Sequence, residues 1–158
     1  MTTGRFFLGF LLVIGCIFGC VYATLAAEYT GWEADSAYNR LYQKSELDRI
    51  KGDVVKVMEI VPMPGMSTGV ALLVRDELDE TVTVHLGPKS FLGDSFGIRR
   101  GDRIKVRGAW AELDGKDIFM AAKIKKGDHY TLKLRFTKNG EPFWLLSPEE
   151  LAKERAAD

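Results

Sequence analysis

Short runs of β-prone residues, separated by turn residues, fill the chain from Arg49 onwards and constrain its fold most strongly. Five runs are predicted strands, at residues 54–61, 69–75, 81–86, 103–108 and 119–124. An acidic turn at 76–80 joins the second and third, and Asp114-Gly115 is a typical hairpin turn between the last two. Three strands, a non-strand segment and two more strands is the order of an OB-type barrel. We therefore expect a mainly β protein with a five-stranded OB-fold domain at residues 49–146.

Two further elements are expected after the fifth strand. Residues 130–136 and 143–146 form a predicted extra C-terminal hairpin that turns around Asn139-Gly140. Ser147 and Glu150 have the spacing of a helix capping box, and Pro148 occupies the first helical position. The pattern predicts a short terminal helix within residues 147–158.

An uncharged apolar run, Phe6 to Ala27, precedes the predicted domain. Its 22 residues exceed the minimum for a membrane-spanning helix, which needs roughly 17 to 25. We expect a transmembrane anchor, with signal-peptide cleavage near Ala27 and lipoprotein processing at Cys16 as the alternatives. Arg5 before the run places the domain outside the cytoplasm, in a periplasm or an organelle lumen. Residues 28–48 are expected to be a juxtamembrane linker.

Two short motifs carry a resemblance to a known family. GMSTG occupies residues 65–69 and HLGP occupies residues 85–88, and the runs GDVVKVMEIV, GDRIKVRGAW and KNGEPFW accompany them. Over about residues 51–144 the chain resembles a family of small bacterial exported OB-fold proteins. That resemblance implies the fold rather than an activity.

The sequence of the predicted domain contains no recognisable catalytic arrangement of residues. Both cysteines, Cys16 and Cys20, lie in the apolar run, so the domain has no thiol for a disulfide or a zinc site. It has two histidines, His85 and His129, and no P-loop, GxSxG or HExxH motif. We therefore expect a protein without enzymatic activity.

Charge is distributed unevenly along the chain. Residues 28–98 carry 7 basic and 12 acidic side chains, whereas residues 99–138 carry 12 basic and 5 acidic ones. Strand alternation places Arg103, Lys105 and Arg107 on one face, and it groups Lys133 with Arg135 on the first strand of the predicted C-terminal hairpin. Such a stripe indicates a binding surface for an anionic ligand or for a protein partner in the same membrane. An ordinary solvated strand face is the alternative interpretation.

The loop between the first two strands is a second candidate site. Met63, Met66 and Ser67 lie in this loop, which borders the usual ligand face of an OB-fold. Thioethers select copper(I), and the imidazole of His85 could add a ligand, so Met63, Met66 and His85 form a candidate copper site. Methionines at such a place also serve as adaptable packing, and His85 could bridge a strand end to a loop by a hydrogen bond.

The sequence favours a non-enzymatic, membrane-anchored binding or assembly module on the non-cytoplasmic side. The alternative function is a metal-handling module for copper or iron, for example in an envelope or magnetosome-type compartment. Single-stranded nucleic acid is a weaker third choice, because its binders combine basic grooves with stacking aromatics and the strand stripe here has none. The expected location outside the cytoplasm also argues against nucleic acid.

Overall fold

The computed structural model describes residues 28–157 of the chain. The predicted membrane segment, Phe6 to Ala27, lies outside these residues. Within residues 28–157, no helix is both long enough and apolar enough to cross a bilayer.

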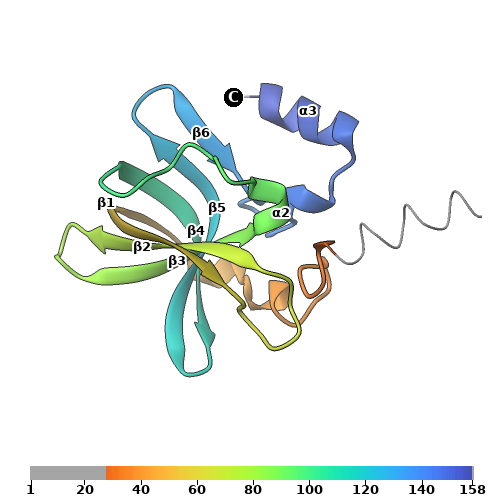
Figure 1. The fold of residues 1–158 in the computed structure, drawn as a ribbon, viewed down its shortest axis with the longest axis horizontal. Coiled ribbons are helices and arrows are strands. Elements are labelled where there is room, and N and C mark those ends of the chain that lie inside the picture. The colour runs from red at the N-terminus through yellow and green to blue at the C-terminus, as the bar shows by residue number, and fades with distance from the viewer. Residues whose placement is uncertain (1–27, 158) are drawn as a thin grey trace, which may run out of the picture.

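A six-stranded sheet dominates the described part of the chain (Figure 1). Its spatial order is β3-β2-β1-β4-β5-β6, with antiparallel neighbours, and β3 also pairs in parallel with β5 through two residue pairs. The mainly β class predicted from the sequence is confirmed. The strands are β1 (Leu47–Ile60), β2 (Gly69–Asp76), β3 (Thr81–Pro88), β4 (Arg103–Leu113), β5 (Lys116–Lys126) and β6 (Tyr130–Lys133).

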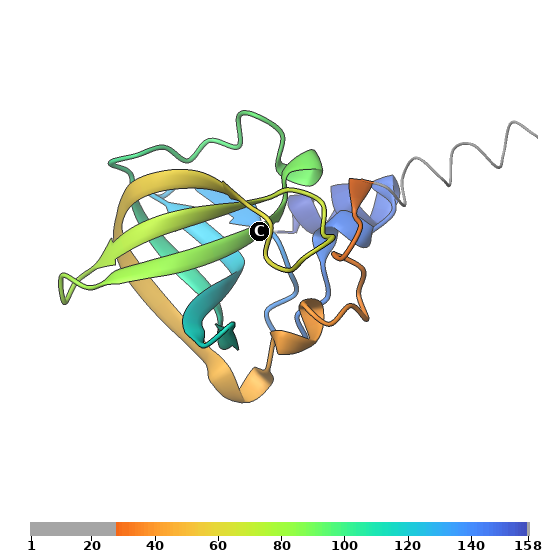
Figure 2. The same ribbon diagram turned by 60° about the horizontal axis from the view of Figure 1, so that its bottom comes forward.

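The longest strand, β1, begins seven residues before the predicted start, because its polar first half still alternates. Ile50 and Val54 are buried, whereas Arg49 and Lys51, on either side of Ile50, are exposed. β1 pairs with β4 through residues 47–53 and with β2 through residues 52–60, and the pairing with β2 contains a bulge between Val54 and Lys56. Figure 2 shows the resulting strong curvature of β1.

Tight turns connect β2 to β3 and β4 to β5. The β2–β3 turn has Asp79 at φ 66°, and the β4–β5 turn has Asp114 at φ 51° followed by Gly115 at φ 71°. The second of these is the predicted Asp114-Gly115 hairpin turn, which requires positive φ at both central residues. A helical turn, α2 (Lys89–Leu92), follows β3 in the segment expected to lack strand structure.

The sheet encloses one apolar cluster. Alternate residues of its strands are completely or almost completely buried, and Ile98 from the segment after α2 packs with them. This cluster contains Val54, Leu72, Val74, Val84, Leu86, Ile104, Val106, Phe119, Ile124 and Leu134 among others. Burial of this apolar surface is the main stabilising contribution to the domain, because the described residues contain no cysteine.

A second cluster forms around the segment that we expected to be a linker. Trp32 and Tyr38 are fully buried, and the Trp32 ring packs edge-on against Tyr38 at 4.9 Å and against Trp144 at 5.8 Å. Any side chain at Gly69 or Gly87 would collide with Trp32 or Trp144, respectively. The aromatic residues next to the apolar run therefore belong to the folded domain, and the short helices η1 (Asn39–Leu41) and η2 (Lys44–Glu46) lead from them into β1.

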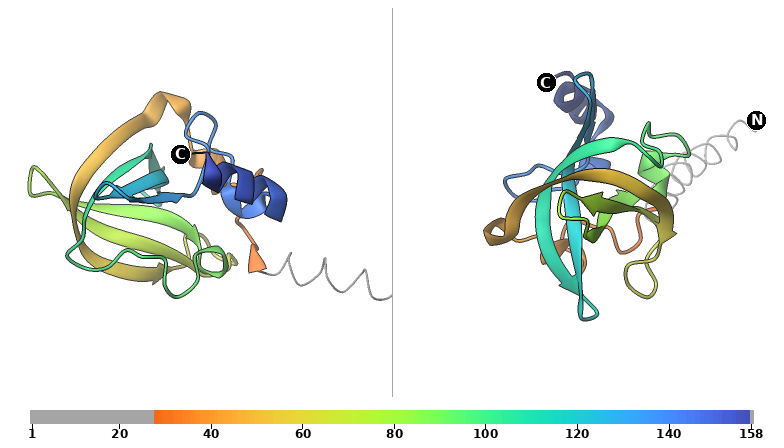
Figure 3. Two further views of the ribbon diagram at one scale, coloured as in Figure 1. Left: turned by 90° about the horizontal axis from the view of Figure 1, so that it is seen from above. Right: turned by 90° about the vertical axis from the view of Figure 1, so that its left-hand side faces the viewer.

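The end of the chain differs in part from the prediction. β6 pairs with β5, but the expected second hairpin strand at 143–146 is instead a 3-10 helix, η3 (Phe143–Leu145). Only a single bridge, Arg135 with Pro142, remains of the hairpin, because Pro142 supplies no amide hydrogen for continued pairing. The terminal helix α3 (Pro148–Ala156) has the predicted capping box of Ser147 and Glu150. Figure 3 shows α3 at the same end of the sheet as the N-terminal segment.

Candidate functional site

Cationic side chains gather on the solvent side of β1, β4, β5 and β6. They alternate along each strand with inward residues such as Ile50, Val106 and Ile124. We call this surface the basic face and define it by Arg49, Lys51, Arg103, Lys105, Arg107, Lys123, Lys125 and Lys133.

The strand register sets these cations directly opposite one another. One row across the sheet runs Arg49, Arg107, Lys123 and Lys133, so that four adjacent strands each contribute a cation. The next row runs Lys51, Lys105 and Lys125. Directly opposed side chains have Cβ atoms about 4.5–5.5 Å apart, and like charges at that position destabilise a sheet. The basic face therefore carries a repulsion that an anion would relieve.

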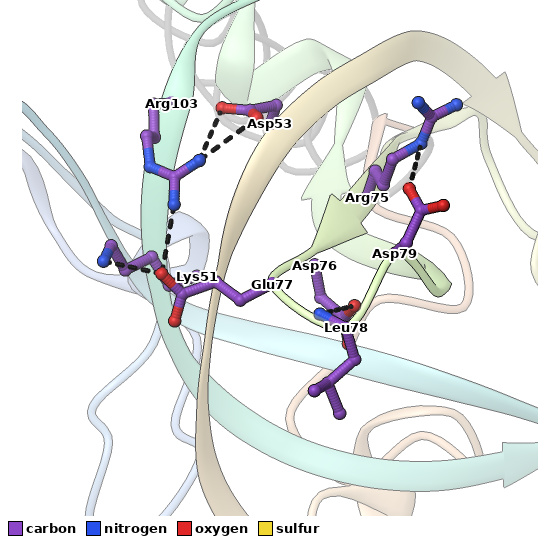
Figure 4. Close-up of polar contacts among 8 residues, drawn as sticks. All are labelled: Lys51, Asp53, Arg75, Asp76, Glu77, Leu78, Asp79 and Arg103. Atoms are coloured by element: carbon purple, nitrogen blue, oxygen red, sulfur yellow. Dashed lines mark hydrogen bonds and ion pairs between the residues drawn. The ribbon is translucent and has the colours of Figure 1, made fainter.

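One end of the basic face is already neutralised by carboxylates (Figure 4). Glu77 reaches from the β2–β3 turn, and its Oε1 lies 2.7 Å from Lys51 Nζ and 3.0 Å from an Arg103 nitrogen. Asp53 lies 3.1 Å from the same guanidinium. The hydrogen bond from Lys51 and the charges of both cations lower the pKa of Glu77 below its ordinary value.

The centre of the basic face has no such partners. Within residues 28–157, the side chains of Arg49, Lys105, Arg107 and Lys125 form no ion pair or hydrogen bond. A shallow pocket of about 240 Å³ opens beside the Arg49 and Arg107 pair and is also lined by Leu47, Asp48 and Thr137. Two of the predicted basic residues, Lys105 and Arg107, thus lie at the unneutralised centre, and Arg103 lies at its neutralised edge.

Lys133, at the end of the first row, is partly covered. Its Nζ donates hydrogen bonds to the carbonyl oxygens of Glu154, at 2.6 Å, and Ala157, at 3.0 Å. These carbonyls belong to the last turn of α3 and the residue after it, where unpaired acceptors and the helix dipole favour a cation. Lys133 therefore holds α3 against the sheet.

Arg135 was predicted to share the basic surface, and this prediction is wrong. Its side chain is only 3% exposed. The amides of Leu134 and Arg135 both donate to the carbonyl of Ala122, at 2.8 and 3.1 Å, which is the pattern of a bulge. This bulge breaks the alternation after β6 and turns Arg135 inward.

Buried Arg135 lies among aromatic rings and neutral acceptors. Its guanidinium carbon is 4.6 Å from the Trp144 ring centroid and 6.0 Å from that of Tyr42. Its Nη1 donates to Asn39 Oδ1 at 2.7 Å and to the Gly140 carbonyl at 3.3 Å, whereas Nε has no partner in the described structure. Burial lowers the pKa of Arg135 to about 10, so it remains a cation at neutral pH. Sequence reasoning missed this structural role because no local motif marks a buried arginine.

The residues of the candidate copper site have structural partners. Met63 and Met66 are partly buried against the second cluster, and the Ser67 hydroxyl donates to the Glu28 carbonyl at 2.8 Å. The buried Nδ1 of His85 lies 2.9 Å from the Tyr38 hydroxyl. Burial and the charge of Arg135 lower the His85 pKa to about 4, so its imidazole is neutral at pH 7. No group of three or more His, Cys, Asp or Glu side chains suited to a metal occurs among residues 28–157.

A comparison with known protein families identifies one that the chain matches. Residues 46–131, more than half of the chain, match the MamS/MamX magnetosome protein family. The chain belongs to the MamS/MamX magnetosome protein family. None of the curated proteins compared with the chain matches it.

The MamS/MamX region runs from the start of β1 into β6. It contains seven of the eight residues of the basic face, with Lys133 just outside, and it contains Met63, Met66 and His85. The buried rings of Trp32 and Trp144, and Arg135 between them in the chain, lie outside it. Membership of a magnetosome family indicates that the protein is associated with a membrane-bound compartment.

Proposed function

We propose that this MamS/MamX protein is a non-enzymatic assembly module that uses its basic face to bind an anionic partner in the magnetosome compartment. The observation that best supports this proposal is the set of cations that the strand register places opposite one another. Opposed cations on four adjacent strands cost stability. At the centre of the face, Arg49, Lys105, Arg107 and Lys125 form no ion pair within residues 28–157. A binding function gives a physical reason for that cost.

The proposal includes an OB-type barrel as the scaffold. The strand order β3-β2-β1-β4-β5 and the parallel pairing of β3 with β5 support it, since that pairing joins the first and fifth positions of the sheet. The short β6 extends the scaffold and widens the basic face by Lys133. The resemblance to exported OB-fold proteins is consistent with the same scaffold.

The proposed module is held at a membrane by Phe6 to Ala27, with its domain on the non-cytoplasmic side. The length of the apolar run, the position of Arg5 and the magnetosome family support this arrangement. A protein in the same membrane is the partner that such an arrangement favours.

Metal handling is the second candidate, because a magnetosome family is compatible with it. The proposed ligands would be Met63, Met66 and His85, but the first two pack on a core cluster and the third is bound to Tyr38. These residues therefore do not form a ready coordination set for copper or iron. Metal analysis of the purified full chain after exposure to each metal tests this candidate. Binding that is lost in both Met63→Ala and His85→Ala would favour metal handling over the assembly role.

Affinity capture from magnetosome membranes tests the assembly role. The wild-type chain is compared with a Lys105→Glu/Arg107→Glu variant and with a control, Lys116→Glu/Lys138→Glu, whose residues are exposed and lie outside the basic face. We expect the wild type and the control to retain the same partner and the face variant to lose it. Equal capture by all three proteins would contradict the proposed function, provided that their thermal unfolding is also equal.

A further inference from the structure

Glu77 shows which chemistry the basic face recognises. Its carboxylate reaches this face from the β2–β3 turn and lies between Lys51 and Arg103 (Figure 4). Both distances, 2.7 and 3.0 Å, are those of charge-assisted hydrogen bonds. The β2–β3 turn is fixed while it presents Glu77, because Asp76 Oδ1 accepts from the amides of Leu78 and Glu80.

A position equivalent to the one that Glu77 occupies lies one row further along the sheet. Lys51 pairs with Lys105 and Asp53 pairs with Arg103, so Lys51 and Arg103 are diagonal neighbours on β1 and β4. Arg49 and Lys105 stand in the same diagonal relation, shifted by two residues on each strand. No carboxylate of residues 28–157 pairs with either of them. The sheet thus contains a filled carboxylate position and an unfilled copy of it.

The spacing of the two positions matches an extended peptide. Two residues along a strand span about 6.6–6.8 Å, which is also the distance between side chains on the same side of an extended segment. Beyond the unfilled position lie Arg107 and the pocket with Leu47, whose side chain is 40% exposed. The surface can therefore receive acidic side chains two residues apart, with an apolar neighbour at the pocket.

We infer that the basic face binds an acidic protein segment in extended conformation, with one carboxylate between Arg49 and Lys105 and the next acidic side chain at Arg107. This inference rests on the proposed function and names the partner's chemistry. Protein is favoured over lipid headgroups because the anionic group that Lys51 and Arg103 bind in this structure is a side-chain carboxylate, that of Glu77.

Fluorescence anisotropy with the full chain in phosphatidylcholine nanodiscs tests the inference. The probe is a labelled peptide of alternating Glu and Ser, with a Gln-Ser peptide as the neutral comparison. We expect Arg49→Gln/Lys105→Gln to weaken binding of the acidic peptide by about tenfold or more. The control Lys116→Gln/Lys138→Gln removes the same charge from exposed sites outside the face and should change binding by less than about twofold.

A Glu77→Gln variant gives an opposite expected result. Removing its carboxylate frees the position between Lys51 and Arg103, so the acidic peptide should bind more tightly than to the wild type. Equal weakening by the face variant and the control would overturn the inference. Binding of phosphatidylglycerol vesicles or inorganic phosphate, without binding of the acidic peptide, would overturn it and leave the proposed function standing. Binding of none of these anionic probes would contradict both.

Discussion

The hydroxyl of Tyr38 lies 2.9 Å from Nδ1 of His85 and joins the segment before β1 to the end of β3. The two rings are nearly parallel, with centroids 6.0 Å apart. Burial raises the pKa of Tyr38, so its hydroxyl stays protonated, and the neutral imidazole can accept its hydrogen bond. Residues 47 positions apart in the chain are thereby fixed together inside the domain.

This contact predicts an acid-dependent loss of stability. The unfolded chain protonates His85 near pH 6.5, whereas the folded protein holds its pKa at about 4. The contribution of neutral His85 to the free energy of unfolding is therefore fully present above pH 6.5. It falls as the pH drops toward 4, by up to about 3 kcal/mol. Urea unfolding of the wild type and of His85→Gln across this pH range measures the effect. A parallel decline in the two proteins would show that His85 does not cause it.

Trp32 should contribute to stability like a core residue. Its ring is fully buried, and Nε1 donates to the Ser67 carbonyl at 2.9 Å. Trp32→Ala is expected to lower the free energy of unfolding by about 3–5 kcal/mol, because it leaves a large cavity. Glu33→Ala, at an exposed neighbouring position, is the control. A linker residue would give a loss below about 0.5 kcal/mol in the same denaturant titration.

The main strands could be predicted because alternation and turn residues are local signals. Asp114 with Gly115 marks a hairpin turn, and Ser147 with Glu150 marks the start of a helix, within a few residues. The sequence did not reveal the burial of Trp32, because its partners Tyr38 and Trp144 meet it only through the tertiary fold. The neighbouring apolar run also offered a different explanation for aromatic rings at that place.

The candidate site was predicted in part for the same reason. Alternation located Lys105 and Arg107 correctly on an outward face, since both lie within a regular strand. It failed at Arg135, where two amides share the Ala122 carbonyl and the period of two ends. The rows of opposed cations could not be predicted from the sequence, because the register of β1, β4 and β5 brings together residues that are far apart in the chain.

Arg135 and Arg107 should respond differently to truncation. Arg135→Ala removes a buried side chain that contacts Trp144 and bonds to Asn39, so we expect a loss of about 2–4 kcal/mol. Arg107→Ala changes an exposed residue and should cost less than about 0.5 kcal/mol. Thermal and urea unfolding compare the two. Similar small losses would contradict the buried position of Arg135.

The repulsion between the cation rows should depend on salt. Arg107 is directly opposite both Arg49 and Lys123, so Arg107→Gln is expected to stabilise the domain by about 0.2–1 kcal/mol at low ionic strength. The gain should shrink in 1 M salt, where the Debye length falls to about 3 Å. Lys138→Gln, at an exposed site outside the rows, should show no gain. A change in stability that does not depend on salt would show that the cations of these rows do not repel one another measurably.

Photo-crosslinking in native membranes tests the binding role of the basic face most directly. The full chain carries a benzoylphenylalanine in place of Lys105 or Lys125 on the face, or in place of Lys116 or Lys138 outside it. We expect one shared partner adduct from the two face positions, reduced by high salt, and none from the other two. Adducts from Lys116 and Lys138 alone, or equal yields from all four positions, would contradict it.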